Sequence, residues 1–279
     1  RSTNGGHSWE AISPDLTRNE PARQGPGGGP FTNEGAGGET YNTISYLACS
    51  PHQAGTIWVG TDDGLVHLTR DEGQSWAEVT PVGLEECLIN AIELSPHQPA
   101  MAFVAATRYK FGDLQPLAYL TRDYGKSWQK ITIGLDPGTP VRVIREDPLR
   151  PGLLYAGTEA GLYVSFNYGQ RWHRFQLNLP VCPITDLLIR DNALVAAIPG
   201  RSFWILDDLG PLQQSSGSLG WQPVLFAPKP ALRFATDTPA KGKPGSALGQ
   251  NPPDGMAIYY YLPQRLDSAE LRLDILDAR

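Results

Sequence analysis

An eight-residue pattern that occurs four times constrains the fold of this chain more than any other feature. Its copies lie at residues 2–9, 69–76, 121–128 and 165–172, and they share the form Ser/Thr-x-Asp/Asn-x-Gly-x-Ser/Arg-Trp. The Asp or Asn side chain is suited to accept hydrogen bonds from backbone N–H groups of the same turn. The glycine adopts positive φ without steric cost. The pattern, called the box below, therefore predicts a repeated β-hairpin turn in a repeat protein.

We expect the recurring box residues to be structural. Each box ends in a Trp, whose large apolar surface packs between neighbouring units when repeats stack. Asp71 and Asp123 lie inside the predicted hairpins, so we expect neither to be a catalytic acid or a metal ligand. The expected structural positions are Asn4, Trp9, Asp71, Trp76, Asp123, Trp128, Asn167 and Trp172.

A longer unit surrounds the boxes. In the first complete unit, β-rich runs cover residues 44–51, 56–61, 64–68 and 77–80, and the box precedes the last run. Units with the same order begin at residues 89 and 141, and a fourth, at 184–206, has no box. Gly, Pro, Asn and Asp bound the runs, as expected of strands joined by turns. Four strands in roughly 40 to 50 residues is the size of one propeller blade.

The boxes resemble the Asp-box, or BNR, repeats of sialidases, sortilin-type receptors, xyloglucanases and photosystem assembly factors. The runs 157–166 and 200–208 are similar to large exported bacterial proteins described as sortilin-like or glycosyl-hydrolase-like. The resemblance covers residues 1 to about 209 and implies a β-propeller in an exported protein, periplasmic or extracellular. It implies little about activity, because these families do unrelated things.

The sequence predicts an all-β protein in three segments. Residues 1–209 are expected to form part of an Asp-box β-propeller, with one partial blade and about four fuller blades. Residues 210–254 are rich in Pro, Gly, Ser and Gln and are expected to be a linker, with 225–228 and 231–234 as candidate edge strands. Apolar runs at 256–262 and 269–276 predict the first strands of a β-sandwich in residues 255–279.

We interpret the chain as a fragment, because Arg1 falls within a blade and Arg279 directly follows a predicted strand. The missing blades of the same chain are therefore expected partners. A signal peptide is not observable in such a sequence, so the exported location is an expectation from the resemblance alone.

Composition narrows the classes of function. The net charge of −6 and the lack of a Lys/Arg run argue against a nucleic-acid partner. The sequence has no run of 18 apolar residues and therefore predicts no membrane span. Cys49, Cys87 and Cys182 form no Cys-x-x-Cys pair, so we expect no metal site and no cofactor. We expect Cys49 to be buried in an inner strand; a disulfide between Cys87 and Cys182 is a minor alternative.

The order of strands in a blade divides the loops between two faces. The loops between blades and the loops between second and third strands share one face, called the loop face below, and the boxes lie on the other. Candidate catalytic carboxylates on the loop face are Asp62, Asp63, Glu85, Glu86 and Asp136. Candidate binding residues are Glu39, Tyr41, Arg108, Tyr109, Arg142, Glu159 and Arg201. A solvated rim is the alternative interpretation of the same residues.

We predict a non-catalytic binding or scaffold module that presents the loop face to a protein, peptide or glycan. The first alternative is a glycoside hydrolase of the xyloglucanase type, which needs two carboxylates across a cleft. An assembly factor that holds a partner during maturation is another, although the acidic balance does not favour it. A sialidase is disfavoured, because the context of Arg108, Arg142 and Arg201 does not match the sialidase pattern.

Overall fold

The computed structural model describes residues 1–24, 41–215, 217, 220–231, 255–264 and 271–276. The chain divides into two units, Arg1–Asp207 and Asp208–Arg279, close to the point where the sequence repeats end. Strands dominate the described residues, which confirms the predicted all-β class. In this part of the chain, no helix has the length and apolar character needed to cross a membrane.

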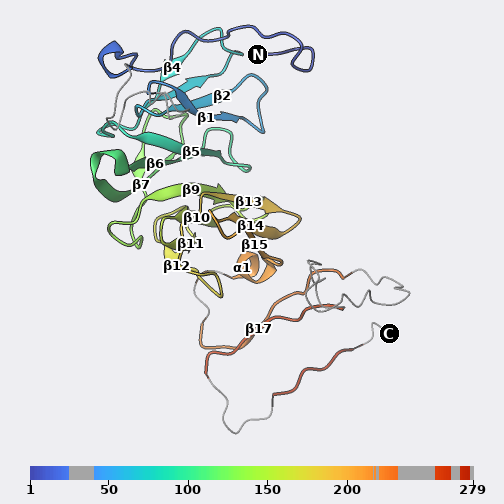
Figure 1. Cartoon of the computed structure of the whole chain (residues 1–279). Coiled ribbons are helices and arrows are strands. Elements are labelled where there is room, and N and C mark those ends of the chain that lie inside the picture. Colours follow the sequence, from blue (N-terminus) through green and yellow to red (C-terminus); the bar gives the residue numbers. More distant parts are fainter. Residues whose placement is uncertain (25–40, 216, 218–219, 232–254, 265–270, 277–279) are drawn as a thin grey trace, which may run out of the picture. The chain divides into compact units, whose positions relative to one another are not determined.

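The first unit consists of successive antiparallel sheets, each with its strands paired in chain order (Figure 1). The first sheet contains β1 (Ile44–Cys49), β2 (Ile57–Thr61), β3 (Val66–Thr69) and β4 (Ala77–Glu78). The second contains β5 (Leu88–Leu94), β6 (Ala102–Arg108), β7 (Asp113–Thr121) and β8 (Gln129–Lys130). The third contains β9 (Val141–Glu146), β10 (Leu154–Thr158), β11 (Gly161–Ser165) and β12 (His173–Arg174). The fourth, which lacks a box, has three strands: β13 (Asp186–Arg190), β14 (Ala193–Ala197) and β15 (Phe203–Leu206).

The sheets are arranged as the blades of a β-propeller. The first strands β1, β5, β9 and β13 are neighbours in space, so each sheet lies beside the next. The core lies between the sheets, where Trp58 of the first packs with Ile89 and Ile92 of the second. Gly60 permits this approach, because a Cβ at that position would overlap the Ile89 side chain. The predicted propeller blades are thus confirmed.

All four boxes share one set of hydrogen bonds, and in the first box the Asn4 side chain accepts the Ser8 N–H at 3.0 Å. The Asp71 carboxylate accepts the Ser75 N–H at 2.9 Å, and the Asp123 carboxylate accepts the Ser127 N–H at the same distance. In the last box the Asn167 side chain takes the same place and accepts the Arg171 N–H at 3.0 Å. The aspartates are therefore engaged in holding their own turns.

The Trp residues of the last three boxes join each sheet to the segment before it. The indole N–H of Trp76 donates to the Ile12 carbonyl at 2.9 Å, and that of Trp128 donates to the Val79 carbonyl at 2.8 Å. Trp172 repeats the contact across the next interface. Each of these boxes thus supplies the same kind of hydrogen bond between its sheet and the segment before it.

Trp9 differs from the other box tryptophans, and the expected packing between repeats does not apply to it. Its side chain is 75% exposed, and its indole N–H donates to Gly6 of the same box. The described residues 1–24 contain no strand, only the short helix η1 (Pro21–Arg23).

The second unit contains α1 (Gly210–Gln214), β16 (Val224–Leu225) and β17 (Tyr260–Tyr261). β16 and β17 pair with each other, so the expected linker and the expected sandwich segment share a two-stranded sheet. The strand expected over 269–276 is not seen in its described part, because residues 271–276 belong to no strand and to no sheet. The β-sandwich itself remains a prediction.

Candidate functional site

The two adjacent carboxylates that follow β2 are bonded to neighbouring segments. Asp63 is fully buried, and its Oδ2 accepts the Asn42 amide at 2.6 Å and the Arg18 backbone N–H at 2.7 Å. Asp62 accepts the N–H and the hydroxyl of Thr43, at 2.8 and 3.0 Å. Burial raises the pKa of Asp62, and its bonds to Thr43 oppose that shift. Both carboxylates therefore anchor segments that approach the first sheet.

Glu86 is held by the segment before β1. Arg23 of η1 donates to its Oε1 at 2.5 Å, and the Tyr41 hydroxyl donates to the same oxygen. The Arg23 guanidinium also lies 5.9 Å from the centre of the Tyr41 ring. Tyr41 and Glu86, both expected on the loop face, are thus brought together, with Arg23 as a partner that the sequence did not indicate.

Asp136 lies beside the third sheet. Its carboxylate accepts the Tyr163 hydroxyl at 2.7 Å and lies 3.5 Å from the Arg174 guanidinium. Burial, followed by the bond to this carboxylate, raises the pKa of Tyr163 to about 12. Asp136 is therefore placed as a hydrogen-bond acceptor for a neutral phenol.

The hairpin between β6 and β7 extends the second sheet on the loop face. These strands pair out to Arg108 and Asp113, and η2 (Tyr109–Phe111) forms the tip. The corresponding hairpin of the third sheet turns directly after the pair Thr158 and Gly161. The second sheet thus projects a tip that its neighbour lacks.

Exposed aromatic rings at this tip are braced by arginines. Tyr109 and Phe111 are 37% and 38% exposed. The guanidinium of Arg142 lies 5.2 Å from the Tyr109 ring, and that of Arg108 lies 5.3 Å from the Phe111 ring. Both distances are within reach of a cation–π interaction. We call Arg108, Tyr109, Phe111, Leu114 and Arg142 the aromatic platform; its exposed Leu114 comes from β7.

Carboxylates complete the platform. Glu85 pairs with Arg108, and Glu159 pairs with Arg142. Five of the expected residues, Glu85, Arg108, Tyr109, Arg142 and Glu159, therefore meet in one place, whereas the sequence did not single out Phe111 or Leu114. Arg201 is exposed at the β14–β15 turn and is not among the residues of this cluster. Glu39 lies outside the described residues.

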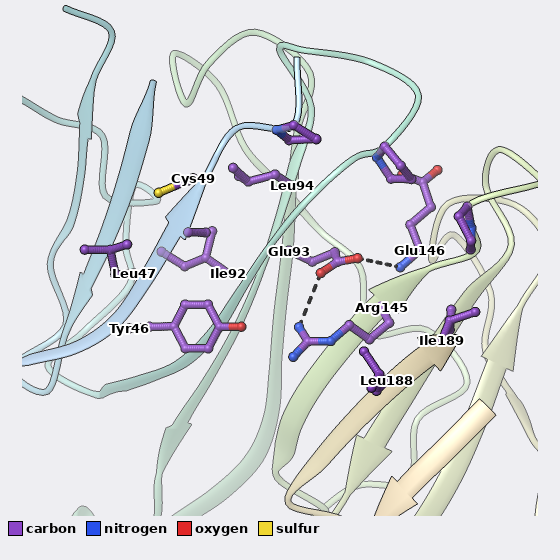
Figure 2. A pocket seen from close by; sticks show the side chains of 14 residues that line it. Tyr46, Leu47, Cys49, Ile92, Glu93, Leu94, Arg145, Glu146, Leu188 and Ile189 are labelled. Atoms are coloured by element: carbon purple, nitrogen blue, oxygen red, sulfur yellow. Dashed lines mark hydrogen bonds and ion pairs between the residues drawn. The ribbon is translucent and has the colours of Figure 1, made fainter. Parts of the chain in front are cut away.

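A cavity of about 440 Å³ lies at the other end of the inner strands (Figure 2). It is bordered by β1, β5, β9 and β13 and the turns that follow the first three. None of the residues expected on the loop face lines it. Its lining consists of Tyr46, Leu47, Ala48, Cys49, Pro51, Ile92, Glu93, Leu94, Pro96, Arg145, Glu146, Pro148, Leu188 and Ile189.

Charged side chains in the wall of this cavity join neighbouring sheets. Arg145 of β9 lies 3.3 Å from the Glu93 carboxylate of β5 (Figure 2). It also lies 2.7 Å from the Asp186 carboxylate of β13. Its Nε donates to the Leu187 carbonyl at 2.8 Å, and the Glu146 N–H donates to Glu93 at 3.1 Å. The sequence signal for this cluster is a charge inside each of two largely apolar inner strands, Glu93 in β5 and Arg145 in β9.

Glu93 is expected to make stability depend on pH. Burial raises its pKa to about 7 although Arg145 opposes the shift. Because the folded state holds this proton more tightly than the unfolded state, stability from Glu93 is full below about pH 4.5 and is lost as pH rises toward 7. The free energy of unfolding should fall by up to about 3 kcal/mol more between pH 5 and pH 8 in the wild type than in Glu93→Gln. Urea unfolding at both pH values measures this; parallel curves would contradict it.

The three cysteines, all within the described residues, are free thiols. Cys87 and Cys182 are buried and unpaired, so the alternative of a disulfide between them is not realised. Cys49 is exposed, and the expectation that it is buried is wrong. It lies at the end of β1 and borders the cavity, so no neighbouring sheet covers it.

Comparison with known proteins gives partial likenesses. No family model matches the chain. The oligoxyloglucan-reducing end-specific xyloglucanase of Emericella nidulans is 27% identical over 110 residues, which are 38% of this chain and 14% of that protein. The chain thus spans a small part of the length of this curated relative.

Solved structures give partial likenesses as well. The GH74 xyloglucanase from Xanthomonas campestris is 17% identical with a TM-score of 0.48, over 60% of this chain and 28% of the other. YCF48 bound to D1 peptide is 22% identical with a TM-score of 0.43, over 58% of this chain and 54% of the other. This chain is thus similar over part of its length to xyloglucanases and to YCF48, while its propeller blades follow from its own sheets.

Proposed function

We propose that this chain is a non-catalytic binding module of an exported Asp-box protein, and that the aromatic platform contacts its protein, peptide or glycan partner. The exposed rings of Tyr109 and Phe111, each beside an arginine, carry this proposal. Tyr and Arg are enriched among the residues that dominate binding energy, and aromatic side chains lose little conformational freedom on binding. Rings that are already braced lose less freedom still when a partner binds.

A glycoside hydrolase of the xyloglucanase type is the second candidate, favoured by the similarity to the Emericella nidulans xyloglucanase. Such chemistry needs one carboxylate as acid and one as base or nucleophile. Here Asp62 and Asp63 accept backbone N–H bonds, and Glu85 and Glu86 are paired with arginines. Because each carboxylate already has a structural partner, we place binding ahead of hydrolysis.

Platform variants test the proposed function. We expect Tyr109→Ala and Phe111→Ala to weaken binding at least about tenfold, the loss of roughly 1.4 kcal/mol typical of a central aromatic contact. The probes are a glycan array that includes xyloglucan oligosaccharides and an array of synthetic peptides, with titration calorimetry on those that bind. Leu149→Ala is the matched control, since this exposed residue lies in the turn after β9, away from the loop face.

Two results would decide against binding at the platform. One is that both variants bind the glycans or peptides found on the arrays as tightly as the wild type does. The other is release of reducing ends from xyloglucan that disappears in Glu85→Gln, which would establish the hydrolase instead.

A further inference from the structure

The fourth sheet lacks the strand that completes each of the other three. In the first three sheets a box follows the third strand, and the fourth strand, β4, β8 or β12, begins directly after the box Trp. After β15 the chain has no box, and the next element is α1. β15 is therefore the edge of a three-stranded sheet, and an edge strand leaves backbone N–H and C=O groups free to pair with another segment.

The register of the complete sheets shows where a fourth strand would pair. In each of them, one carbonyl of the third strand accepts the N–H of the residue three positions after the box Trp. These carbonyls belong to Val66, Ala118 and Leu162, at distances of 2.8, 2.9 and 2.8 Å. Phe203 holds the same position on β15, because it pairs with Ala197 as Val66 pairs with Gly60, and the residue before it closes the hairpin in both sheets. The outer side of β15 thus repeats the pairing positions that β4 uses on β3.

A groove between the third and fourth sheets lies where the next box Trp would insert. The box indoles donate to a carbonyl three residues after the preceding box Trp, and these carbonyls belong to Ile12, Val79 and Ile131. The next carbonyl at this spacing is that of Phe175, three residues after Trp172. Phe175 lines the groove with Leu162 on one side, and Leu194, Trp204 and Leu206 of the fourth sheet line the other. The groove is therefore at the place that a box Trp fills at the earlier junctions.

The groove suits one uncharged side chain. Its described lining contains no Asp, Glu, Lys, Arg or His. Its volume of about 60 Å³ holds roughly four waters, whereas sites for drug-sized ligands have about 300 Å³ or more. Leu177 and Ile205, which also line it, are 66% and 59% exposed, so the groove is open to a partner. A side chain carried by a strand fits this place better than a free small molecule does.

We propose that β15 and this groove bind an extended segment of a partner protein, which adds to the fourth sheet as an antiparallel strand and inserts a Trp side chain between the third and fourth sheets. The earlier junctions define this ligand. Its Trp indole N–H donates to the Phe175 carbonyl, and an apolar residue three positions later donates its N–H to the Phe203 carbonyl. In strand addition, main-chain hydrogen bonds give affinity and the inserted side chain gives specificity. The site lies at the edge of the fourth sheet, whereas the aromatic platform is centred on the β6–β7 hairpin of the second.

A peptide copied from the second sheet tests the site on the full chain. Acetyl-Gly-Lys-Ser-Trp-Gln-Lys-Ile-Thr-amide reproduces residues 125–132, which hold a box Trp and the strand after it. Titration by NMR should show this peptide binding about tenfold or more tighter than the same peptide with Ala in place of Trp. Methylation of the Ile N–H, which would donate to Phe203, should weaken binding to a similar extent. Methylation of the N–H of the second Lys is the matched control, because successive N–H groups of a strand point to opposite sides and this one points away from β15.

A variant of β15 gives the corresponding test in the protein. Ile205 corresponds to Leu68, which pairs with Ala77 of β4, so Ile205→Pro removes an N–H that faces the added strand. Pro is tolerated on the outward side of an edge strand, so the circular dichroism should stay native while peptide binding is lost. Ile205→Val keeps the N–H and should bind as the wild type does.

Equal binding of the Trp and Ala peptides, or no binding by the natively folded wild-type chain, would overturn the proposal. Unchanged binding by natively folded Ile205→Pro would overturn the pairing with β15. Tyr109→Ala should leave the peptide affinity unchanged, so failure of this site and failure of the aromatic platform are distinguishable.

Discussion

Replacing Trp172 with Ala is expected to lower the free energy of unfolding by about 3 to 5 kcal/mol. The Trp172 side chain is 2% exposed, so its removal leaves a large cavity between the second and third sheets. The Ile131 carbonyl also loses the indole N–H that reaches it at 2.7 Å. Loss of apolar contact and loss of a buried hydrogen-bond partner act in the same direction.

Trp9→Ala is the matched control, because Trp9 occupies the same position of its own box but is largely exposed. We expect it to change stability by no more than about 0.5 kcal/mol, as is usual at surface positions. Urea unfolding followed by circular dichroism measures both variants without relying on Trp fluorescence. Similar losses in the two variants would show that the box Trp acts within its hairpin and not between sheets.

The repeats made the blades predictable because strand order and turn chemistry are local. The fourth unit, predicted at 184–206, contains β13 (Asp186–Arg190), β14 (Ala193–Ala197) and β15 (Phe203–Leu206). Alternating apolar residues and the Gly, Asp and Asn turns between them decide such elements without distant contacts. The short outer strands were overestimated: β4 covers only Ala77–Glu78 of the predicted 77–80.

The sites were less predictable because they depend on contacts between sheets. Glu93 and Arg145 lie on different inner strands, and only the packing of β5 beside β9 brings them together. Phe111 joins the platform because the β6–β7 hairpin projects past its sheet, a length that residue types alone did not reveal. Partners of the loop residues, such as Arg23 for Glu86, come from segments outside the repeat.

Asp63→Ala is expected to destabilise the chain by about 3 kcal/mol, because it removes the acceptor of several buried donors. Asn42 Nδ2, the Arg18 N–H and the Thr61 hydroxyl all donate to this carboxylate, which is fully buried. Without this carboxylate, either these donors are left without an acceptor or the segments around residues 18 and 42 detach from the first sheet. Asp191→Asn, at a highly exposed carboxylate whose positive φ an Asn also adopts, should change stability by less than about 0.5 kcal/mol.

A second substitution at this position, Asp63→Asn, separates a structural from a catalytic carboxylate. If Asp63 were the acid or base of a hydrolase, Asp63→Asn would lose xyloglucan cleavage. Its urea midpoint would stay close to that of the wild type, because catalytic groups are often held at a cost to stability. The hydrogen bonds of Asp63 predict the reverse. The Asn side chain keeps one acceptor oxygen but brings an amide N–H₂ against the buried donors, so the midpoint should fall. An unchanged midpoint would remove the structural assignment of Asp63 and return it to the catalytic candidates.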